Sequence, residues 1–167
     1  VYLPLIVASF YLSWAKKERS LLARLVAIAA ACLVLPLAIN VDIPRPWFAA
    51  GAMAPKGWYL CALLTTYFAT TVPFVKTVIR ERNSTPWFVG SITVHVVVVL
   101  AMAALAVQGY NYWTHVLVWV LLTGRAVAMP LLAKRRGVPW RPRNIGMPEI
   151  GYSLLVFATL PYGLAFP

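Results

Sequence analysis

The residues best suited to chemistry are basic and lie in one short stretch between two long apolar runs. Lys76, Arg80 and Arg82 surround Glu81 there, and on a helix Lys76, Arg80 and Asn83 would share a face. Cations this close together can hold a phosphate or another anionic headgroup at a membrane surface. The same charge also suits a simpler role, because Lys and Arg in short loops set the orientation of a membrane protein. The stretch predicts an anionic-ligand site or an orientation signal.

Four further polar residues lie within or beside apolar runs. His95 has Ser91 one helical turn before it, on the same face. An ionisable side chain in hydrocarbon marks a functional site by default, although a neutral His bonded to a carbonyl is an equally good structural solution. Arg125 lies near the middle of another run, at an insertion cost of about 2.5–3.5 kcal/mol. It must face the bundle or stretch to the interface, and Glu149 is a suitable partner.

Motifs that would name a reaction are absent from the sequence. There is no Walker A loop, GxGxxG, HExxH or nucleophile elbow, and the four acidic residues form no DxxD or ExxE pair. We therefore expect no cofactor and no metal site, and whether the protein is an enzyme stays open. Cys32 and Cys61 lie in apolar runs without CxxC spacing, so they are expected to act as small packing residues.

The composition places the chain in a membrane. Of its 167 residues 62% are hydrophobic and 11% are charged, whereas a soluble domain carries about 25% charged residues. So few charges could not cover the surface of a soluble protein. In a membrane this is no difficulty, because helices of about 20 apolar residues can face lipid on all sides. The net charge of +11 is explained by basic loops, so nucleic acid is not an expected partner.

The apolar runs predict the architecture. We expect an all-α bundle, a single transmembrane helical domain over residues 1–167. Its first run opens without a Met, so we expect an N-terminal part of the protein to precede it. Six spans are predicted, over residues 1–14, 21–39, 58–75, 87–107, 113–129 and 150–166.

The basic residues also predict the orientation. Eleven Lys and Arg fall in the connections 15–20, 76–86 and 134–149, against only Arg45 and Lys56 in the others. This bias places those three connections in the cytoplasm and both ends of the chain on the other side. Thr66 and Thr70 share a face of the third span, where they either pack helices together or line a polar cavity.

Three motifs resemble the YwiC-like family of bacterial integral membrane proteins. They are Glu18–Leu22, then Phe74–Arg82 with Ser91 and His95, and finally Arg141–Gly146 with Glu149 and Ser153. The order and spacing agree over nearly the whole chain, which corresponds to about the C-terminal two-thirds of the family's proteins. The resemblance implies the bacterial cytoplasmic (inner) membrane and membrane lipids as partners.

Two departures from the family are visible. Its opening Gln-His-Gly motif and one or two further spans are missing here, and Ala23 and Arg24 stand where the family tends to carry Asn-Asp. The family's helices look distantly similar to UbiA-type prenyltransferases. Those enzymes hold a magnesium-bound diphosphate on aspartate-rich loops, and this chain lacks such loops.

Three functions are compatible with these features. The first is a UbiA-like protein whose cytoplasmic face binds an anionic lipid or an isoprenoid diphosphate, an anionic amphiphile in either case. The second is a transporter of small molecules or ions, with Arg125 and His95 among its intramembrane polar groups. The third is a structural or assembly role. For the first we predict one cytoplasmic pocket with His95 at its floor and a rim formed by Lys76, Arg80, Glu81, Arg141, Arg143 and Glu149.

Overall fold

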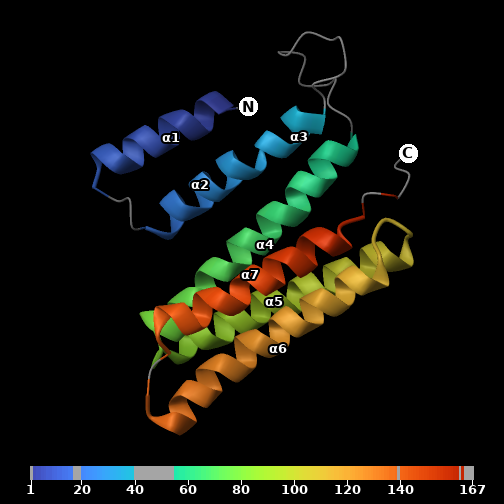
Figure 1. Ribbon diagram of the computed structural model, residues 1–167. Helices are drawn as coiled ribbons and strands as arrows, with labels where there is room; N and C mark the ends of the chain where they lie inside the picture. The colour runs from blue at the N-terminus through green and yellow to red at the C-terminus, as the bar shows by residue number, and fades with distance from the viewer. Residues whose placement is uncertain (1, 17–19, 40–54, 139, 162, 164–167) are drawn as a thin grey trace. The chain divides into compact units, whose positions relative to one another are not determined.

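In the computed structural model the chain is helical, as predicted (Figure 1). The structure describes residues 2–16, 20–39, 55–138, 140–161 and 163, and these contain no strand. Its helices are α1 (Tyr2–Trp14), α2 (Leu21–Cys32), α3 (Val34–Ile39), α4 (Pro55–Ile79), α5 (Thr85–Val107), α6 (Trp113–Arg136) and α7 (Pro142–Thr159).

Four helical segments are long and apolar enough to cross a membrane: Leu21–Ala38, Pro55–Ile79, Thr85–Val107 and Trp113–Arg136. They correspond to the second to fifth predicted spans. The first predicted span is an apolar helix of 13 residues, shorter than a bilayer crossing requires. The sixth corresponds to α7, which is not among the four. The described helices fit a multi-pass membrane protein.

Two helix ends differ from the sequence prediction. The fifth span was expected to end near Pro130, but α6 continues to Arg136, because a membrane helix can accommodate an internal Pro. Gly137 ends α6 in the left-handed conformation with φ 67°, which a residue without a Cβ adopts at little cost. The last helix begins at Pro142 rather than at 150, with Pro at its N-terminus.

The described residues form two compact units, Val1–Ala69 and Thr70–Pro167, with α4 contributing to both. In the first unit α1 packs against α2, and α2 begins at Ser20, whose Oγ accepts a hydrogen bond from the Ala23 backbone N–H at 3.1 Å. Cys32 and Cys61 are buried and free, as expected of packing residues.

The second unit contains every candidate site residue. Its α5 and α6 are antiparallel neighbours, as the short connection between them predicts, and Gly109 (φ 80°) allows the tight turn. In Figure 1 the α4–α5 and α6–α7 connections lie at the same end of this unit. Near that end a buried cluster joins three helices through Phe74, Val78, Ala126 and Ile145.

Candidate functional site

An ion pair joins α6 to α7 inside the second unit. The Arg125 guanidinium donates a hydrogen bond to Glu149 Oε1, and only 3% of the Arg125 side chain is exposed. The guanidinium carbon also lies 4.0 Å from the ring centre of Phe74 and 4.9 Å from that of Tyr152. The sequence allowed Arg125 either to face the bundle or to stretch to the interface. In the structure it faces the bundle.

The position of Glu149 differs from its predicted place at the head of the last helix. Because α7 begins at Pro142, Glu149 lies about two turns inside the helix. A helix dipole acts mainly within the first turn, so it no longer stabilises this carboxylate. Arg125 provides the compensating charge, which links α7 to the interior of the bundle.

His95 and Ser91 form a second polar group, on the buried face of α5. His95 is fully buried, and its Nδ1 lies 2.8 Å from the Ser91 carbonyl oxygen. Ser91 is 1% exposed. Neither His95 Nε2 nor Ser91 Oγ has a hydrogen-bond partner among the described residues. The sequence placed these two side chains on one face, and the structure shows that this face is buried.

Lys76 contacts the start of α5. Its Nζ lies 3.7 Å above the centre of the Trp87 ring. The next residue, Thr77, donates a hydrogen bond to the Pro73 carbonyl at 2.7 Å, and its Oγ1 also lies 3.4 Å from the Trp87 carbonyl. These contacts attach the last turn of α4 to the first turn of α5. Arg80, which follows the helix end, is exposed.

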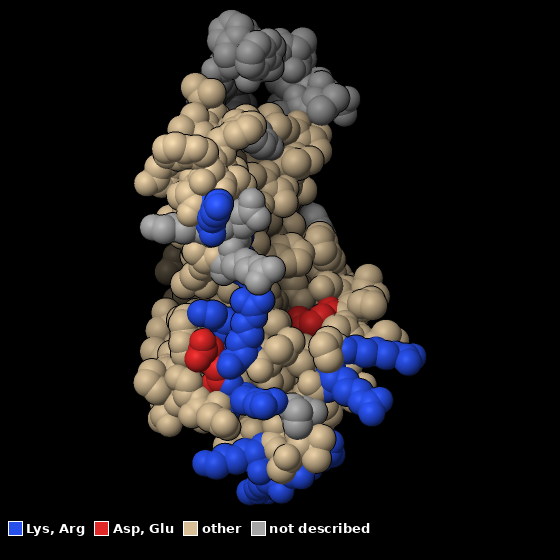
Figure 2. Space-filling model, turned by 90° about the vertical axis from the view of Figure 1, so that its left-hand side faces the viewer, with Lys and Arg blue, Asp and Glu red and all other residues tan. Residues whose placement is uncertain are grey.

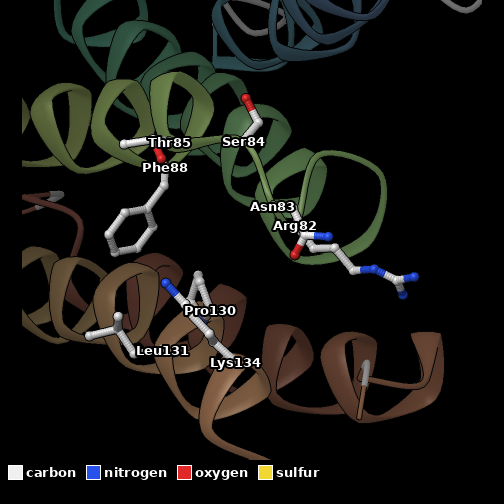
Figure 3. Close-up of a pocket in the computed structure, with 8 residues that line it drawn as sticks. All are labelled: Arg82, Asn83, Ser84, Thr85, Phe88, Pro130, Leu131 and Lys134. Carbon is white, nitrogen blue, oxygen red and sulfur yellow. The ribbon is translucent and has the colours of Figure 1, made fainter. Parts of the chain in front are cut away.

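A cavity of about 420 Å³ opens between the α4–α5 connection and the last turns of α6 (Figure 3). In Figure 3 the Lys134 amine points toward Phe88, whereas the Arg82 guanidinium extends from the outer edge. The lining residues are Arg82, Asn83, Ser84, Thr85, Phe88, Pro130, Leu131 and Lys134.

The candidate residues are thus distributed over several places. Arg82 is the one that lines the cavity, and the rim predicted from the sequence is not the lining of this cavity. Arg141 and Arg143, at the start of α7, are exposed. Figure 2 shows Lys and Arg side chains at several separate places on one face, with acidic side chains beside some of them. The excess of basic over acidic side chains favours the attraction of anions.

Sequence reasoning missed two residues that the structure makes prominent. Lys134 joins the cavity because α6 continues past Pro130. Trp140 donates a hydrogen bond from Nε1 to the Met129 carbonyl at 2.8 Å, and the Arg136 guanidinium lies 5.1 Å from its ring centre. The sequence signal for Trp140 was its position as an aromatic residue next to a basic run.

Other polar groups bear on the alternative functions. The Thr66 hydroxyl donates to the Ala62 carbonyl of its own helix at 2.8 Å, which is a structural role. Thr70 is buried. Within the described part of the chain, no three His, Cys, Asp or Glu side chains come together as a metal site would require.

Comparison with known proteins identifies a family that part of the chain resembles. Residues 1–39 match the model of the family described as YwiC-like protein, a segment that contains the first of the three motifs. No curated protein and no solved structure matches the chain. The resemblance inferred from the sequence is therefore confirmed over these residues: the chain is similar to YwiC-like proteins.

Proposed function

We propose that this protein binds the phosphate-bearing headgroup of an anionic amphiphile, at the basic end of its second unit. The observation that carries the proposal is the composition of the cavity. Arg82 and Lys134 supply positive charge, and none of its eight lining residues is acidic. The net attraction is therefore for an anion.

The remaining lining residues divide into polar and apolar groups, as an amphiphile requires. Asn83, Ser84 and Thr85 offer hydrogen-bond donors for phosphate oxygens, while Phe88 and Leu131 offer apolar surface. A volume of about 420 Å³ is within the range of small-molecule sites. Because Leu131 is also 42% exposed on the outside of α6, an acyl or prenyl chain can leave the cavity along an apolar helix surface.

The surrounding charge strengthens the attraction. Juxtamembrane Lys and Arg contribute about 1 kcal/mol each near an anionic lipid surface. The connections that carry them are expected on the cytoplasmic side of a bacterial inner membrane. In this proposal the protein crosses the bilayer six times, with α7 in the last span and α1, although shorter than a full crossing, as the described part of the first.

An isoprenoid diphosphate belongs to the same chemical class as an anionic lipid, so a UbiA-like arrangement remains part of the proposal. The described acidic residues, however, are Glu81 and Glu149, and the second is paired with Arg125. Glu81 and Glu149 therefore do not provide a pair of free carboxylates that could hold a magnesium-bound diphosphate. The proposal assigns binding and leaves the reaction unassigned.

A lipid titration of the purified protein tests the proposal. We expect phosphatidylglycerol to bind more tightly than phosphatidylcholine, as measured by native mass spectrometry in a neutral detergent. Lys134→Ala should weaken phosphatidylglycerol binding severalfold, because it removes a cation that points into the cavity. Arg82→Ala should weaken it less, because the Arg82 guanidinium extends from the outer edge. Farnesyl diphosphate as a competing probe distinguishes a preference for isoprenoids from one for phospholipids.

Arg135→Ala is the matched control, since Arg135 follows Lys134 on α6 and is not in the cavity lining. It should leave the affinity nearly unchanged. If all three variants lose affinity equally, the attraction comes from general surface charge. If none does, the cavity is not the binding site.

A transporter is the second candidate, favoured by the buried polar groups at His95 and at the Arg125–Glu149 pair. It predicts solute flux in proteoliposomes that depends on these residues. A structural or assembly protein would show neither flux nor the lipid preference.

A further inference from the structure

We propose that His95 and Ser91 form a second, buried site, which binds an O–H donor: a water molecule or the hydroxyl group of a small ligand. The site lies within α5 and is separate from the cavity that carries the proposed function. Both side chains are nearly inaccessible, and each has a polar atom without a partner among the described residues.

The hydrogen bond at Nδ1 determines what His95 can accept. A carbonyl oxygen only accepts, so Nδ1 must carry the proton that it donates to the Ser91 carbonyl at 2.8 Å. In the neutral imidazole Nε2 then holds a lone pair. The neutral ring therefore needs a hydrogen-bond donor at Nε2, and the structure shows none from the described residues.

The Ser91 hydroxyl lacks the bond that other hydroxyls in these helices make. Thr66, Thr123 and Thr159 each donate at 2.8 Å to the carbonyl four residues earlier. For Ser91 that carbonyl belongs to Trp87, which Thr77 of α4 approaches at 3.4 Å instead. The Ser91 O–H thus remains available to a ligand, although the residue is buried.

The second buried histidine shows what a completed arrangement looks like. Trp119 Nε1 donates to His115 Nε2 at 3.2 Å, and His115 Nδ1 lies 2.9 Å from Thr159 Oγ1. Thr159 in turn donates to the Leu155 carbonyl. Every polar atom of this chain of bonds has a partner in the protein, and the Trp119 N–H donates the kind of hydrogen bond that no described residue donates to His95 Nε2.

In this proposal one O–H group bonds both His95 Nε2 and Ser91 Oγ. Its O–H donates a hydrogen bond to His95 Nε2, and its oxygen accepts one from the Ser91 hydroxyl. A carbonyl or a nitrile cannot do so, because it has no proton to donate. Buried polar atoms without partners cost free energy, and ordered water or a ligand is the usual solution. An O–H group that is hydrogen-bonded to His95 Nε2 also lies next to a base that can accept its proton.

Nuclear magnetic resonance of the histidine rings tests this proposal, because the chain has two histidines. With ¹⁵N-imidazole labelling in lipid bilayers there are two ring systems, which His115→Phe assigns. If that variant does not fold, His95→Phe assigns them instead. We expect His95 to be the tautomer protonated at Nδ1.

Magnetisation transfer identifies the occupant. Transfer to the His95 ring from water protons shows a bound water, and transfer from aliphatic C–H protons of a co-purified molecule shows a hydroxyl ligand. The His115 ring should receive neither. Ser91→Ala should reduce the transfer to His95 severalfold, while Ser91→Thr, which keeps the hydroxyl, should preserve it. If the His95 ring receives no more transfer than His115, the proposal is wrong.

Discussion

The two buried histidines of the second unit differ in one respect, the completeness of their hydrogen bonds. Both are fully buried. His115 is bonded at both ring nitrogens, to Trp119 and to Thr159. His95 is bonded at Nδ1 alone within the described part of the chain. Burial therefore does not distinguish a structural histidine from a candidate site, whereas a ring nitrogen without a described hydrogen-bond partner does.

The difference arises from the neighbouring helices. His115 is near the start of α6, where Thr159 of α7 and Trp119 of α6 reach it. His95 turns back along its own helix to the Ser91 carbonyl, so its polar contact is local. The buried charge of Arg125 likewise has its partner on a neighbouring helix, at Glu149 of α7. The comparison predicts that polar groups with partners in the chain stabilise the fold more than those at His95.

The largest expected effect comes from breaking the Arg125–Glu149 pair. Glu149→Gln leaves the Arg125 charge buried without its carboxylate, and we expect a loss of about 3–5 kcal/mol in the free energy of unfolding. Denaturant titration in detergent micelles measures it.

The double variant Arg125→Met, Glu149→Leu is the control, because removing both charges also removes the unpaired one. It should recover most of the lost stability. A Glu149→Gln variant as stable as the parent protein would show that the pair does not hold α7 to α6.

His115→Phe should give the next largest effect. The ring volume is nearly kept, but the Trp119 N–H and the Thr159 hydroxyl each lose a partner. One buried unsatisfied polar group costs about 1–3 kcal/mol. The same titration applied to His95→Phe should show a smaller loss. Equal losses would mean that the completeness of hydrogen bonding does not distinguish the two histidines.

The sequence predicts the local features of this structure well. Long apolar runs predicted the all-α class, and four of the six expected spans are helices of sufficient length and hydropathy. The i, i+4 spacing predicted that Ser91 and His95 share a face, because the helix geometry alone determines this. The short connection between the fourth and fifth predicted spans indicated that α5 and α6 are antiparallel neighbours.

Features that depend on contacts between helices were harder to predict. The composition near Pro130 indicated a helix end, but α6 continues to Arg136 and brings Lys134 to the cavity. Glu149 was recognised as a partner for an arginine, although nothing in the sequence shows where α7 meets α6. The partners of His115 lie 4 and 44 residues away along the chain, and the second spacing carries no sequence signal.

A smaller effect is expected where the partner is an aromatic ring. Lys76→Met removes the cation above Trp87 and keeps much of the side-chain volume. A cation–π contact at a partly exposed site contributes about 0.5–1 kcal/mol, and the free energy of unfolding should fall by that amount. Arg80→Met, which removes an exposed charge nearby, should leave it unchanged. Similar losses in both variants would indicate a general effect of charge.

The smallest expected effect is that of Ser91→Ala. Its hydroxyl has no partner among the described residues, so the variant breaks no bond within that part of the chain. If the hydroxyl is held only by an exchangeable ligand, the loss should be about 0.5 kcal/mol, the lower limit for one hydrogen bond.

Thr159→Val is the matched comparison, because it removes a hydroxyl that His115 Nδ1 contacts at 2.9 Å. It leaves that N–H without an acceptor, which costs about 1–3 kcal/mol. Denaturant titration of both variants decides the comparison: a loss for Ser91→Ala as large as that for Thr159→Val would mean that Ser91 is bonded within the protein, and the difference between the two regions would then disappear.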